Sequence, residues 1–395
     1  MSLRLHAHHF SHMHAHAWHT RVRPTMPMRC RRRWLHPTHP DPEAKNLRQI
    51  WLPALEWIYS ERVRQQVQNS VSPINDAAVL AAADFGVFID LTSMCQKEGG
   101  ERNKVEEALF RHSLQSLDVI YAHEGLGTLL STRLPEGVDV ALGYDDRGWT
   151  NFERAEAELI KPVGFCIDIG LFTVDKACEA YLGNRNPLRI GGARFAERTV
   201  EELAQQGSYS GSAVRGVLGA LVGRGRHPPL APAAFSTLLA GKQFTNGADV
   251  VTVIQLYTET ATALLGSARE LEYKELEWAA ADYVRLGEAL RYCGALETLT
   301  LRKMGLGDAD AAAILVGPPL PSVKTLNLLR CESLTALPDL SVLPSLVNLD
   351  LHGCSALTAL PDVSGLAHLR IFHDSRGDHV HLDGVWPPAI MRERI

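Results

Sequence analysis

Two adjoining stretches decide the fold of the C-terminal third: SVKTLNLLRCESLTALPDLSVLP, residues 322–344, and SLVNLDLHGCSALTALPDVSGLA, residues 345–367. They align without a gap at a period of 23 residues, so that Leu326 matches Leu349. In a run of the form L-x-x-L-x-L, residues that alternate along a short strand point to opposite faces. We therefore expect the leucines inside a stack of parallel strands, with the intervening side chains outside.

Two longer copies precede this pair, and a partial copy follows it. Leu299 in ALETLTLRKMGL matches Leu271 in ARELEYKELEW at an offset of 28 residues, and Leu369–Ile371 supplies the partial copy. The 23-residue copies resemble the leucine-rich repeats of plant immune receptors, and the longer copies resemble the ribonuclease-inhibitor type. The resemblance spans about residues 268–372 and predicts a short solenoid of roughly four or five repeats.

Solenoids of this kind bind protein partners through their concave face, where the outward side chains of the strands lie. The alternative is a purely structural role, in which the repeats only pack against the middle of the chain. The expected partner surface is a mixed polar strip made of Glu297, Thr300, Arg302, Lys324, Asn327, Asn348, Asp350 and His352.

The seven cysteines are scattered along the chain and include no CxxC pair. This odd, unpaired set argues against a disulfide framework and favours a reducing, cytoplasmic location. Cys331 and Cys354 occupy the same position of their repeats, where a small side chain is expected to stack under the strand turn. No metal site is predicted, because the terminal cluster of His373, Asp374, His379, His381 and Asp383 is expected in an exposed tail.

The middle of the chain alternates between strand-like and helix-like segments. The apolar runs Phe85–Asp90, Thr128–Ser131 and Gly164–Phe172 are typical of buried strands, whereas Lys104–Ile120 and Trp149–Ile160 have apolar residues at helical spacing. This order favours an α/β fold in which helices cover both faces of a parallel sheet. Such a sheet binds ligands beyond the carboxyl ends of its strands.

Two motifs in this region carry a family resemblance. VFIDLTSMCQ begins at Val87 and is followed by LDVIYA from Leu117, and YDDRGWTNFE begins at Tyr144. In this order and spacing, over about residues 80–162, they resemble the fungal heterokaryon-incompatibility domain, which is similar to the Toll/interleukin-1-receptor (TIR) domain. The resemblance implies a flavodoxin-like parallel sheet and self-association through this domain. Thr150 stands where the TIR motif Trp-Cys-x-x-Glu has its cysteine.

Some TIR domains cleave NAD, and the resemblance carries their catalytic glutamate to Glu153. One carboxylate suffices to stabilise the oxocarbenium-like centre, because nicotinamide leaves as a neutral group and needs no general acid. Asp90, Gln96, Arg147 and Trp149 would line the pocket, with NAD as the substrate and no certain cofactor. The alternatives are that Glu153 is a solvated residue in the first turn of a helix and that Trp149 belongs to the core.

The N-terminal segment departs from both families, which open with a hydrophobic strand. Here Arg-Cys-Arg-Arg-Arg stands before Trp34, so the first strand is expected to be missing or replaced. Residues 1–40 hold seven Arg and no Asp or Glu, and residues 1–20 hold seven His. We interpret residues 1–45 as a disordered tail, the alternative being an organelle transit peptide.

Charge and hydropathy narrow the function classes. Removing those seven Arg from the chain's 40 Lys and Arg leaves 33 against 45 Asp and Glu, a net charge of −12 for residues 41–395, which gives no reason to expect nucleic-acid binding. No apolar run reaches the roughly 18 residues that span a bilayer. We divide the rest of the chain into a TIR-like domain, residues 46–267, and a repeat domain, residues 268–395. The last helix of the TIR-like domain is expected to follow the turn at Phe244–Asp249 and to run to about Ser267.

Together these patterns predict an intracellular signalling or recognition protein, in which a TIR-like module is coupled to a protein-binding repeat surface. Two alternatives remain open on sequence alone. The first is an NAD-cleaving hydrolase that uses Glu153, and the second is a non-catalytic scaffold.

Overall fold

The structure of the chain is a computed structural model. It describes residues 28–30, 41, 43–55, 58–59, 62, 66, 76–85, 87–88, 101–172, 226–244, 246–358, 363, 365–366 and 369–372. The chain divides into two compact units: residues 1–117, 125–144 and 167–221 form the first, and residues 118–124, 145–166 and 222–395 form the second. The second unit therefore includes segments before residue 268 that the sequence analysis assigned to the TIR-like domain.

The first sheet has four strands in the order β2-β1-β3-β4. Its strands are β1 (Met28–Cys30), β2 (Val87–Phe88), β3 (Gly127–Leu130) and β4 (Cys166–Asp168). Strand β1 runs parallel to both β2 and β3, and β3 is buried along its whole length. Burial of a whole strand is typical of parallel sheets. The other elements described up to residue 171, apart from α6 (Gly148–Ala157), are η1 (Leu47–Trp51), α2 (Asp76–Ala83), α4 (Lys104–Gln115), α5 (Leu117–Ala122), η2 (Val163–Phe165) and η3 (Ile169–Leu171).

This sheet confirms the expected α/β class with parallel strands, and it refines two details. Of the two expectations for the first strand, missing or replaced, only the second is compatible with the structure, because Met28–Cys30 pairs on both sides as β1. A three-residue strand is held by backbone hydrogen bonds and leaves no apolar run in the sequence. The helix expected over Lys104–Ile120 is broken at Ser116, whose hydroxyl donates to the carbonyl of His112 at 2.9 Å.

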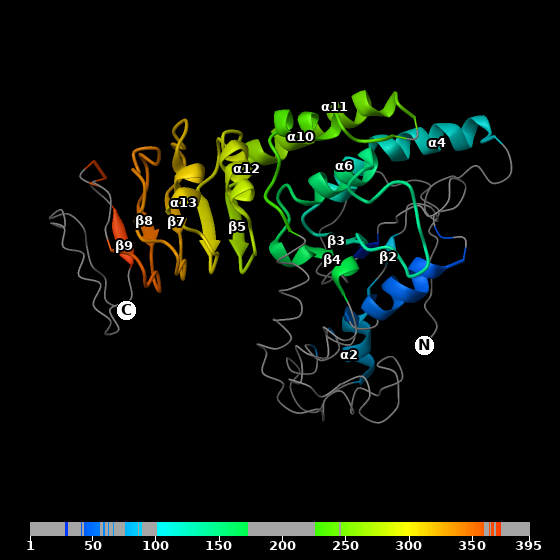
Figure 1. Cartoon of the computed structure of the whole chain (residues 1–395), viewed down its shortest axis with the longest axis horizontal. Coiled ribbons are helices and arrows are strands. Elements are labelled where there is room, and N and C mark those ends of the chain that lie inside the picture. The colour runs from blue at the N-terminus through cyan, green and yellow to red at the C-terminus, as the bar shows by residue number, and fades with distance from the viewer. Residues whose placement is uncertain are drawn as a thin grey trace. The chain divides into compact units, whose positions relative to one another are not determined.

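The second sheet has five parallel strands that follow one another in chain order (Figure 1). Helix α12 (Ala280–Leu290) connects the first two strands, and α13 (Asp308–Leu315) connects the second and third. The register equates Leu299 with Leu271 and Leu326 with Leu349, as in the alignment of the sequence copies. The strands are β5 (Glu270–Lys274), β6 (Thr298–Arg302), β7 (Thr325–Asn327), β8 (Asn348–Asp350) and β9 (Arg370–Phe372).

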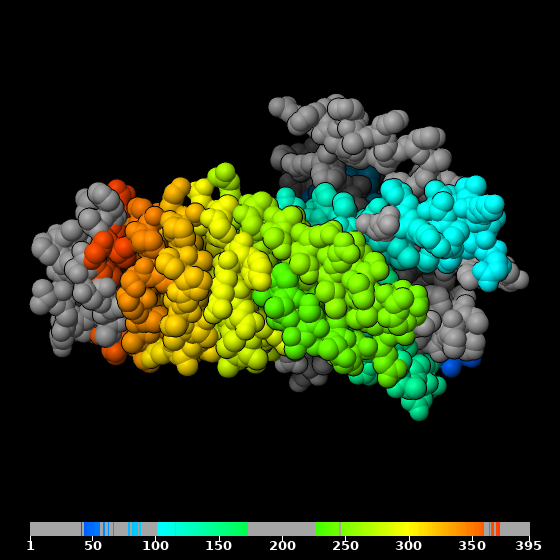
Figure 2. Space-filling view, turned by 90° about the horizontal axis from the view of Figure 1, so that it is seen from above, coloured from blue at the N-terminus to red at the C-terminus, as the bar shows by residue number. Residues whose placement is uncertain are grey.

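The inner side of this sheet is a continuous apolar core. Its central row, Leu271, Leu299, Leu326, Leu349 and Ile371, is at most 4% exposed. In space-filling form the strands and their connections pack against one another in sequence, from yellow to orange (Figure 2). Each member of the row therefore packs against the preceding and following copies, so that the copies stabilise one another.

Two cysteines link successive copies from inside. The Cys331 thiol donates to the carbonyl of Leu301 at 3.0 Å, and the Cys354 thiol donates to the carbonyl of Leu328 at 3.1 Å. Burial raises the pKa of the Cys331 thiol to about 12, which keeps it protonated and able to donate. Both residues are fully buried and free of disulfides, as their equivalent positions in the copies predict.

The turn after each of the first four strands of this sheet uses a left-handed residue at an equivalent position. Glu275, Lys303, Arg330 and Gly353 have φ of 56°, 52°, 57° and 72°. Only the last is glycine, the residue that adopts this conformation without steric cost. Backbone hydrogen bonds between successive turns, such as Arg330 N–H to the carbonyl of His352 at 2.7 Å, hold the other three in place.

Three helices form a second core in this unit: α6 (Gly148–Ala157), α10 (Pro232–Leu239) and α11 (Asp249–Ser267). Phe152 of α6, Phe235 of α10 and Tyr257 of α11 are fully buried, with ring centroids 6.4 Å and 3.9 Å apart in that order. Helix α11 begins at Asp249 and ends at Ser267, which confirms the helix predicted to follow the turn at Phe244–Asp249 and to run to about Ser267.

Candidate functional site

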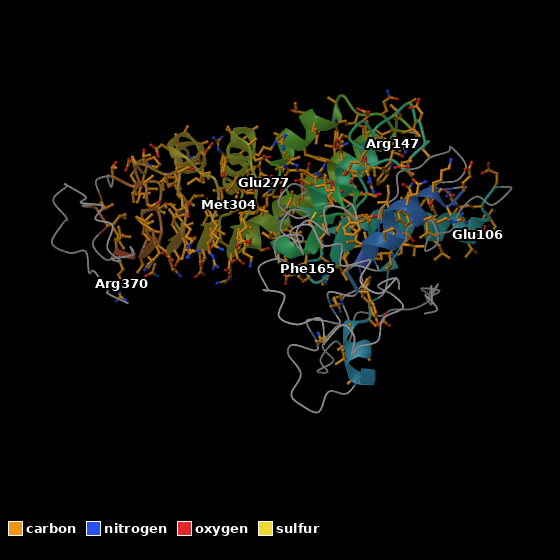
Figure 3. The ribbon with its side chains drawn as sticks, turned by 60° about the horizontal axis from the view of Figure 1, so that its bottom comes forward. Glu106, Arg147, Phe165, Glu277, Met304 and Arg370 are labelled. Carbon is orange, nitrogen blue, oxygen red and sulfur yellow. The ribbon has the colours of Figure 1, made fainter. Side chains whose placement is uncertain are left out.

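The outward face of the five-stranded sheet is built from rows of polar side chains. Pairing places Glu270, Thr298, Thr325, Asn348 and Arg370 in one row, and the next row runs through Glu272, Thr300, Asn327 and Asp350. Arg370 stands at the last strand (Figure 3). The two rows come from the same alternation that buries the leucines, because successive residues of a strand point to opposite faces.

An ion-pair ladder runs along the edge where the strands begin. Glu297 lies 2.7 Å from Arg269 of the preceding copy and 2.8 Å from Lys324 of the following copy. The hydrogen bond and charge of Lys324, with a further contribution from Arg269, lower the pKa of Glu297. At the opposite edge, Lys303 lies 2.7 Å from Glu275. These pairs join neighbouring copies across the face of the sheet.

A second polar group lies on the later strands. Asp350 accepts a hydrogen bond from Asn327 at 3.1 Å and lies 2.7 Å from the Nδ1 atom of His352. Asn348 donates to the hydroxyl of Thr325 at 3.4 Å. Asn327, Asn348, Asp350 and His352 are all half-buried. The structure thus brings four of the eight predicted partner-binding residues together in one small region.

The centre of the strip is more enclosed than the sequence predicts. Thr300 is only 8% exposed, so its side chain offers little surface to a partner. Arg302 is half-buried, and its Nε atom is buried without a hydrogen-bond partner among the described residues. The accessible polar surface therefore lies around this centre. It includes Lys324, whose side chain is 57% exposed, and Glu270, Glu272 and Lys274, which the first strand, β5, leaves exposed.

The residues predicted to form an NAD pocket lie partly outside the described ranges. Asp90 and Gln96 belong to the residues that the structure leaves undescribed. Arg147 precedes α6, and desolvation lowers its pKa although Asp146 acts in the opposite direction. Trp149 is half-buried, and its indole N–H donates to the carboxylate of Asp249 at 3.0 Å. This bond and its edge-on contact with Phe152, at 5.8 Å, tie Trp149 to the helical core.

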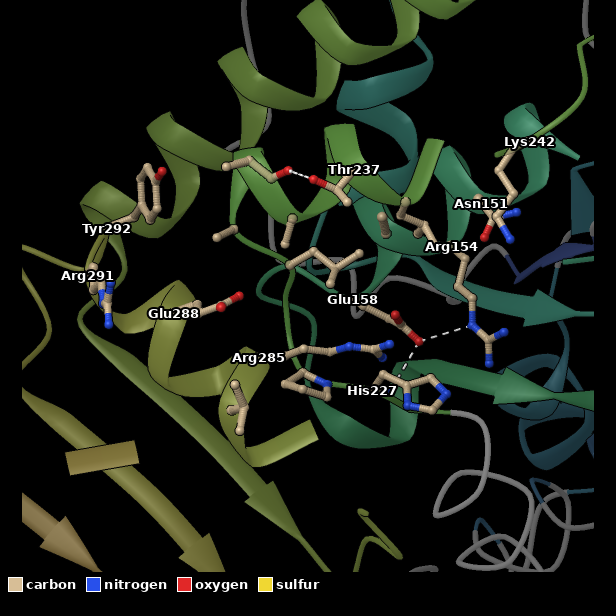
Figure 4. Close-up of a pocket in the computed structure, with 18 of the residues that line it drawn as sticks. Asn151, Arg154, Glu158, His227, Thr237, Lys242, Arg285, Glu288, Arg291 and Tyr292 are labelled. Carbon is tan, nitrogen blue, oxygen red and sulfur yellow. Dashed lines mark hydrogen bonds and ion pairs between the residues drawn. The ribbon is translucent and has the colours of Figure 1, made fainter. Parts of the chain in front are cut away.

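Helix α6 also borders a cleft of about 950 Å³, but Glu153 does not line it. The lining residues of α6 are Asn151, Arg154 and Ala155, with Glu158 just beyond its end (Figure 4). At about 100° per residue, Glu153 lies on the opposite side of the helix from these positions. Glu153 is half-buried and takes part in interactions there. The structure therefore separates the predicted catalytic carboxylate from this cleft.

The sequence analysis missed a buried charged cluster beside the cleft. Arg226, 1% exposed, donates to the carbonyls of Glu158 at 2.6 Å, His227 at 2.5 Å and Lys161 at 3.3 Å. It satisfies carbonyl oxygens beyond the end of α6, where a cation is favoured by the helix dipole. The carboxylate of Glu158, 4% exposed, accepts from the backbone N–H of His227 at 3.1 Å and lies 3.3 Å from Arg154.

The same segment is tied to α12 through His227. Its Nδ1 atom lies 3.0 Å from the carboxylate of Asp282, and Arg285 approaches that carboxylate at 3.4 Å. Burial alone would raise the pKa of Asp282, but the hydrogen bond and charge of His227 outweigh it, so that the pKa is lowered. No sequence pattern predicts this arrangement, because its partners are separated by 55 residues.

The described part of the chain offers neither a metal site nor a membrane-spanning helix. Within it, no group of three or more His, Cys, Asp and Glu side chains is placed to hold a metal ion. None of its helices combines the length and apolarity that crossing a membrane requires. Comparison of the chain with protein-family models, with curated proteins and with solved structures gave no match.

Proposed function

We propose that the chain is a recognition protein in which a leucine-rich-repeat surface binds a protein partner and is coupled to a TIR-like signalling module. The observation that carries the proposal is the second sheet. Its five parallel strands follow chain order, bury a leucine row on one side and present polar rows on the other. A surface repeated at each copy in this way is the recognition surface of solenoid proteins.

The ladders between neighbouring copies support binding of a protein partner. Glu297 pairs with two cations and Asp350 with Asn327 and His352, which favours one arrangement of these side chains before a partner arrives. Favouring one arrangement in advance reduces the entropy lost on binding. A mixed set of charges favours selection among partners more than high affinity. The surface suits a protein with a complementary polar patch.

The TIR-like module has less specific support than the repeat surface. The first sheet is parallel around β1, and the Arg-Gly-Trp-Thr motif begins helix α6 at Gly148. The NAD-cleaving alternative has no comparable support, since Glu153 lies away from the cleft beside its helix. We therefore propose partner recognition as the function and treat NAD cleavage as a separate hypothesis for Glu153.

A charge-reversal experiment tests the proposed surface. The full-length protein is used to capture partners from extracts of its own cells, in parallel with Glu297→Arg and with Glu259→Arg as a control of equal charge change. Glu297 belongs to the ladder, whereas Glu259 is exposed on α11. The proposal expects at least one protein that is captured by the wild type and the control and lost with Glu297→Arg. Identical capture by all three would contradict it.

A further inference from the structure

The cleft beside α6 is separate from the polar face of the five-stranded sheet. Its walls come from α6, from residues 227–238 and from α12, all in the second unit (Figure 4). The segment around α10 contributes mostly small apolar side chains, among them Ala231, Ala233 and Ala234. Val284 of α12, which also lines the cleft, remains 48% exposed. A large apolar side chain left open in a cleft gains stability when an occupant covers it.

The cations of the cleft differ in whether a carboxylate balances their charge. Arg154 lies 3.3 Å from Glu158 and 3.4 Å from Asp145, so that its charge is balanced within the protein. Lys242 and Arg291 lie on opposite sides of the cleft (Figure 4). Neither forms an ion pair with any residue that the structure describes.

Two cations of the lining are left without a carboxylate that balances them. The lining holds the cations Arg154, Lys242, Arg285 and Arg291 and the carboxylates Asp145, Glu158 and Glu288, and Arg285 also lies 3.4 Å from Asp282. The whole chain carries a formal net charge of −5. With Arg154 and Arg285 balanced by neighbouring carboxylates, Lys242 and Arg291 are the cations of the cleft that can attract an acidic ligand.

We propose that this cleft binds an acidic peptide segment of a protein partner. Carboxylates toward the two ends of the segment pair with Lys242 and Arg291, and an apolar side chain between them covers Val284. An enclosed pocket is typical for a small molecule, which usually buries most of its surface. Here Val284 and Arg291 are exposed at the walls, so the cleft fits a chain that enters and leaves it.

The proposed site is distinct from the strand face and does not rest on its function. The ladder residues Arg269, Glu297 and Lys324 do not line the cleft. Charge reversals of equal size, one set in the cleft and one set in the ladder, can therefore show which of the two surfaces binds a given ligand.

The test measures fluorescence anisotropy with the full-length chain and three labelled hexapeptides. The acidic probe is Glu-Glu-Leu-Ala-Glu-Glu, and the matched probes carry Gln or Lys in place of each Glu. We expect the acidic probe to bind at least tenfold more tightly than the Gln probe, a difference of about 1.4 kcal/mol. The Lys probe should not bind. Equal binding of the acidic and Gln probes, or no binding of either, would overturn the proposal.

Two sets of variants locate the binding. Lys242→Glu with Arg291→Glu should weaken the acidic probe at least tenfold, whereas Arg269→Glu with Lys324→Glu, an equal change in charge, should leave it within twofold. Equal weakening by both pairs would show non-specific attraction and refute the site. Val284→Ser should weaken the acidic probe several-fold without a change in charge, and an unchanged affinity would refute the apolar contact.

Inorganic phosphate serves as a competitor in the same assay. Because two separated carboxylates and an apolar contact hold the peptide, millimolar phosphate at constant ionic strength should displace little of it. Full displacement would identify a small-anion site and overturn the assignment to a peptide. Circular dichroism of each variant confirms that the folded state is retained before binding is compared.

Discussion

Replacing Arg226 tests whether one buried cation fixes helix α6 to the sheet with the leucine core. Its guanidinium bridges the carbonyls of Glu158 and Lys161, beyond α6, and its own backbone carbonyl accepts from the indole of Trp278 at 2.9 Å. The Cζ atom also lies 5.7 Å from the ring centroid of Tyr273 on β5. One residue thus contacts both the segment 145–166 and the sheet.

The cost of Arg226→Met follows from the carbonyls that lose their donor. Glu158 and Lys161 are 4% and 2% exposed, so water does not readily replace the guanidinium. Leaving a buried carbonyl without a donor costs about 1–3 kcal/mol, so that two cost about 2–6 kcal/mol. Relief from burying a charge offsets part of this, since the Arg226 Nε atom is buried and has no hydrogen-bond partner among the described residues. We expect a net loss of about 2–5 kcal/mol, a large part of the stability of a typical domain.

The assay is urea unfolding followed by tryptophan fluorescence, with Trp278 as a local reporter. Arg226→Met should move the transition of this unit to a lower urea concentration, and Arg226→Lys, which keeps the charge but loses the fork of donors, should fall between it and the wild type. The control is Arg291→Met, which removes an exposed arginine and should change the unfolding free energy by less than about 0.5 kcal/mol. Equal midpoints for Arg226→Met and Arg291→Met would refute the reasoning.

Three further outcomes follow from the second unit. Leu349→Ala should lower the unfolding free energy by about 2–5 kcal/mol because Leu349 is fully buried. As a control, Asn348→Ala on the same strand should lower it by less than about 1 kcal/mol, because Asn348 is half-buried. Equal denaturation midpoints would contradict the assignment of Leu349 to the core. Site-resolved alkylation at pH 8 should modify Cys331 and Cys354 only in denaturant, since burial raises the pKa of both thiols; rapid modification of the native protein would refute this. The pKa of Asp282 is lowered in the folded state, so its contribution to the unfolding free energy is present above about pH 4 and is lost as the pH falls further. Asp282→Asn should therefore reduce the loss of unfolding free energy between neutral and acid pH. An unchanged pH dependence would argue against the His227 bond.

Sequence repetition predicted the part of the fold in which local pattern and packing agree. The match of Leu326 with Leu349 and of Leu271 with Leu299 is also the strand register. This works because each copy packs only on its neighbours, so that a fixed spacing in sequence becomes a fixed spacing in space. Helix α11 was equally predictable, since the turn at Phe244–Asp249 marks its start.

The features that escaped prediction depend on backbone pairing or on distant partners. Met28–Cys30 forms the strand β1 between two others, yet its Arg-rich sequence has no strand pattern. The bonds from Arg226 to Glu158 and Lys161 join residues 68 and 65 positions apart. Thr300 was expected outside because strands alternate, but the surrounding side chains leave it only 8% exposed. Burial of such residues follows from tertiary packing, which a single sequence does not encode locally.

Site-specific photo-crosslinking tests the proposed recognition surface most directly. A photoreactive amino acid is placed at Thr298 or Thr325 on the strand face, or at Ala309, which is exposed on α13, and each variant is irradiated in the protein's own cells. If the strand face binds a protein partner, Thr298 and Thr325 give the same discrete adduct and Ala309 does not. Adducts from Ala309 alone, or no adduct from either strand position, would contradict the proposed function.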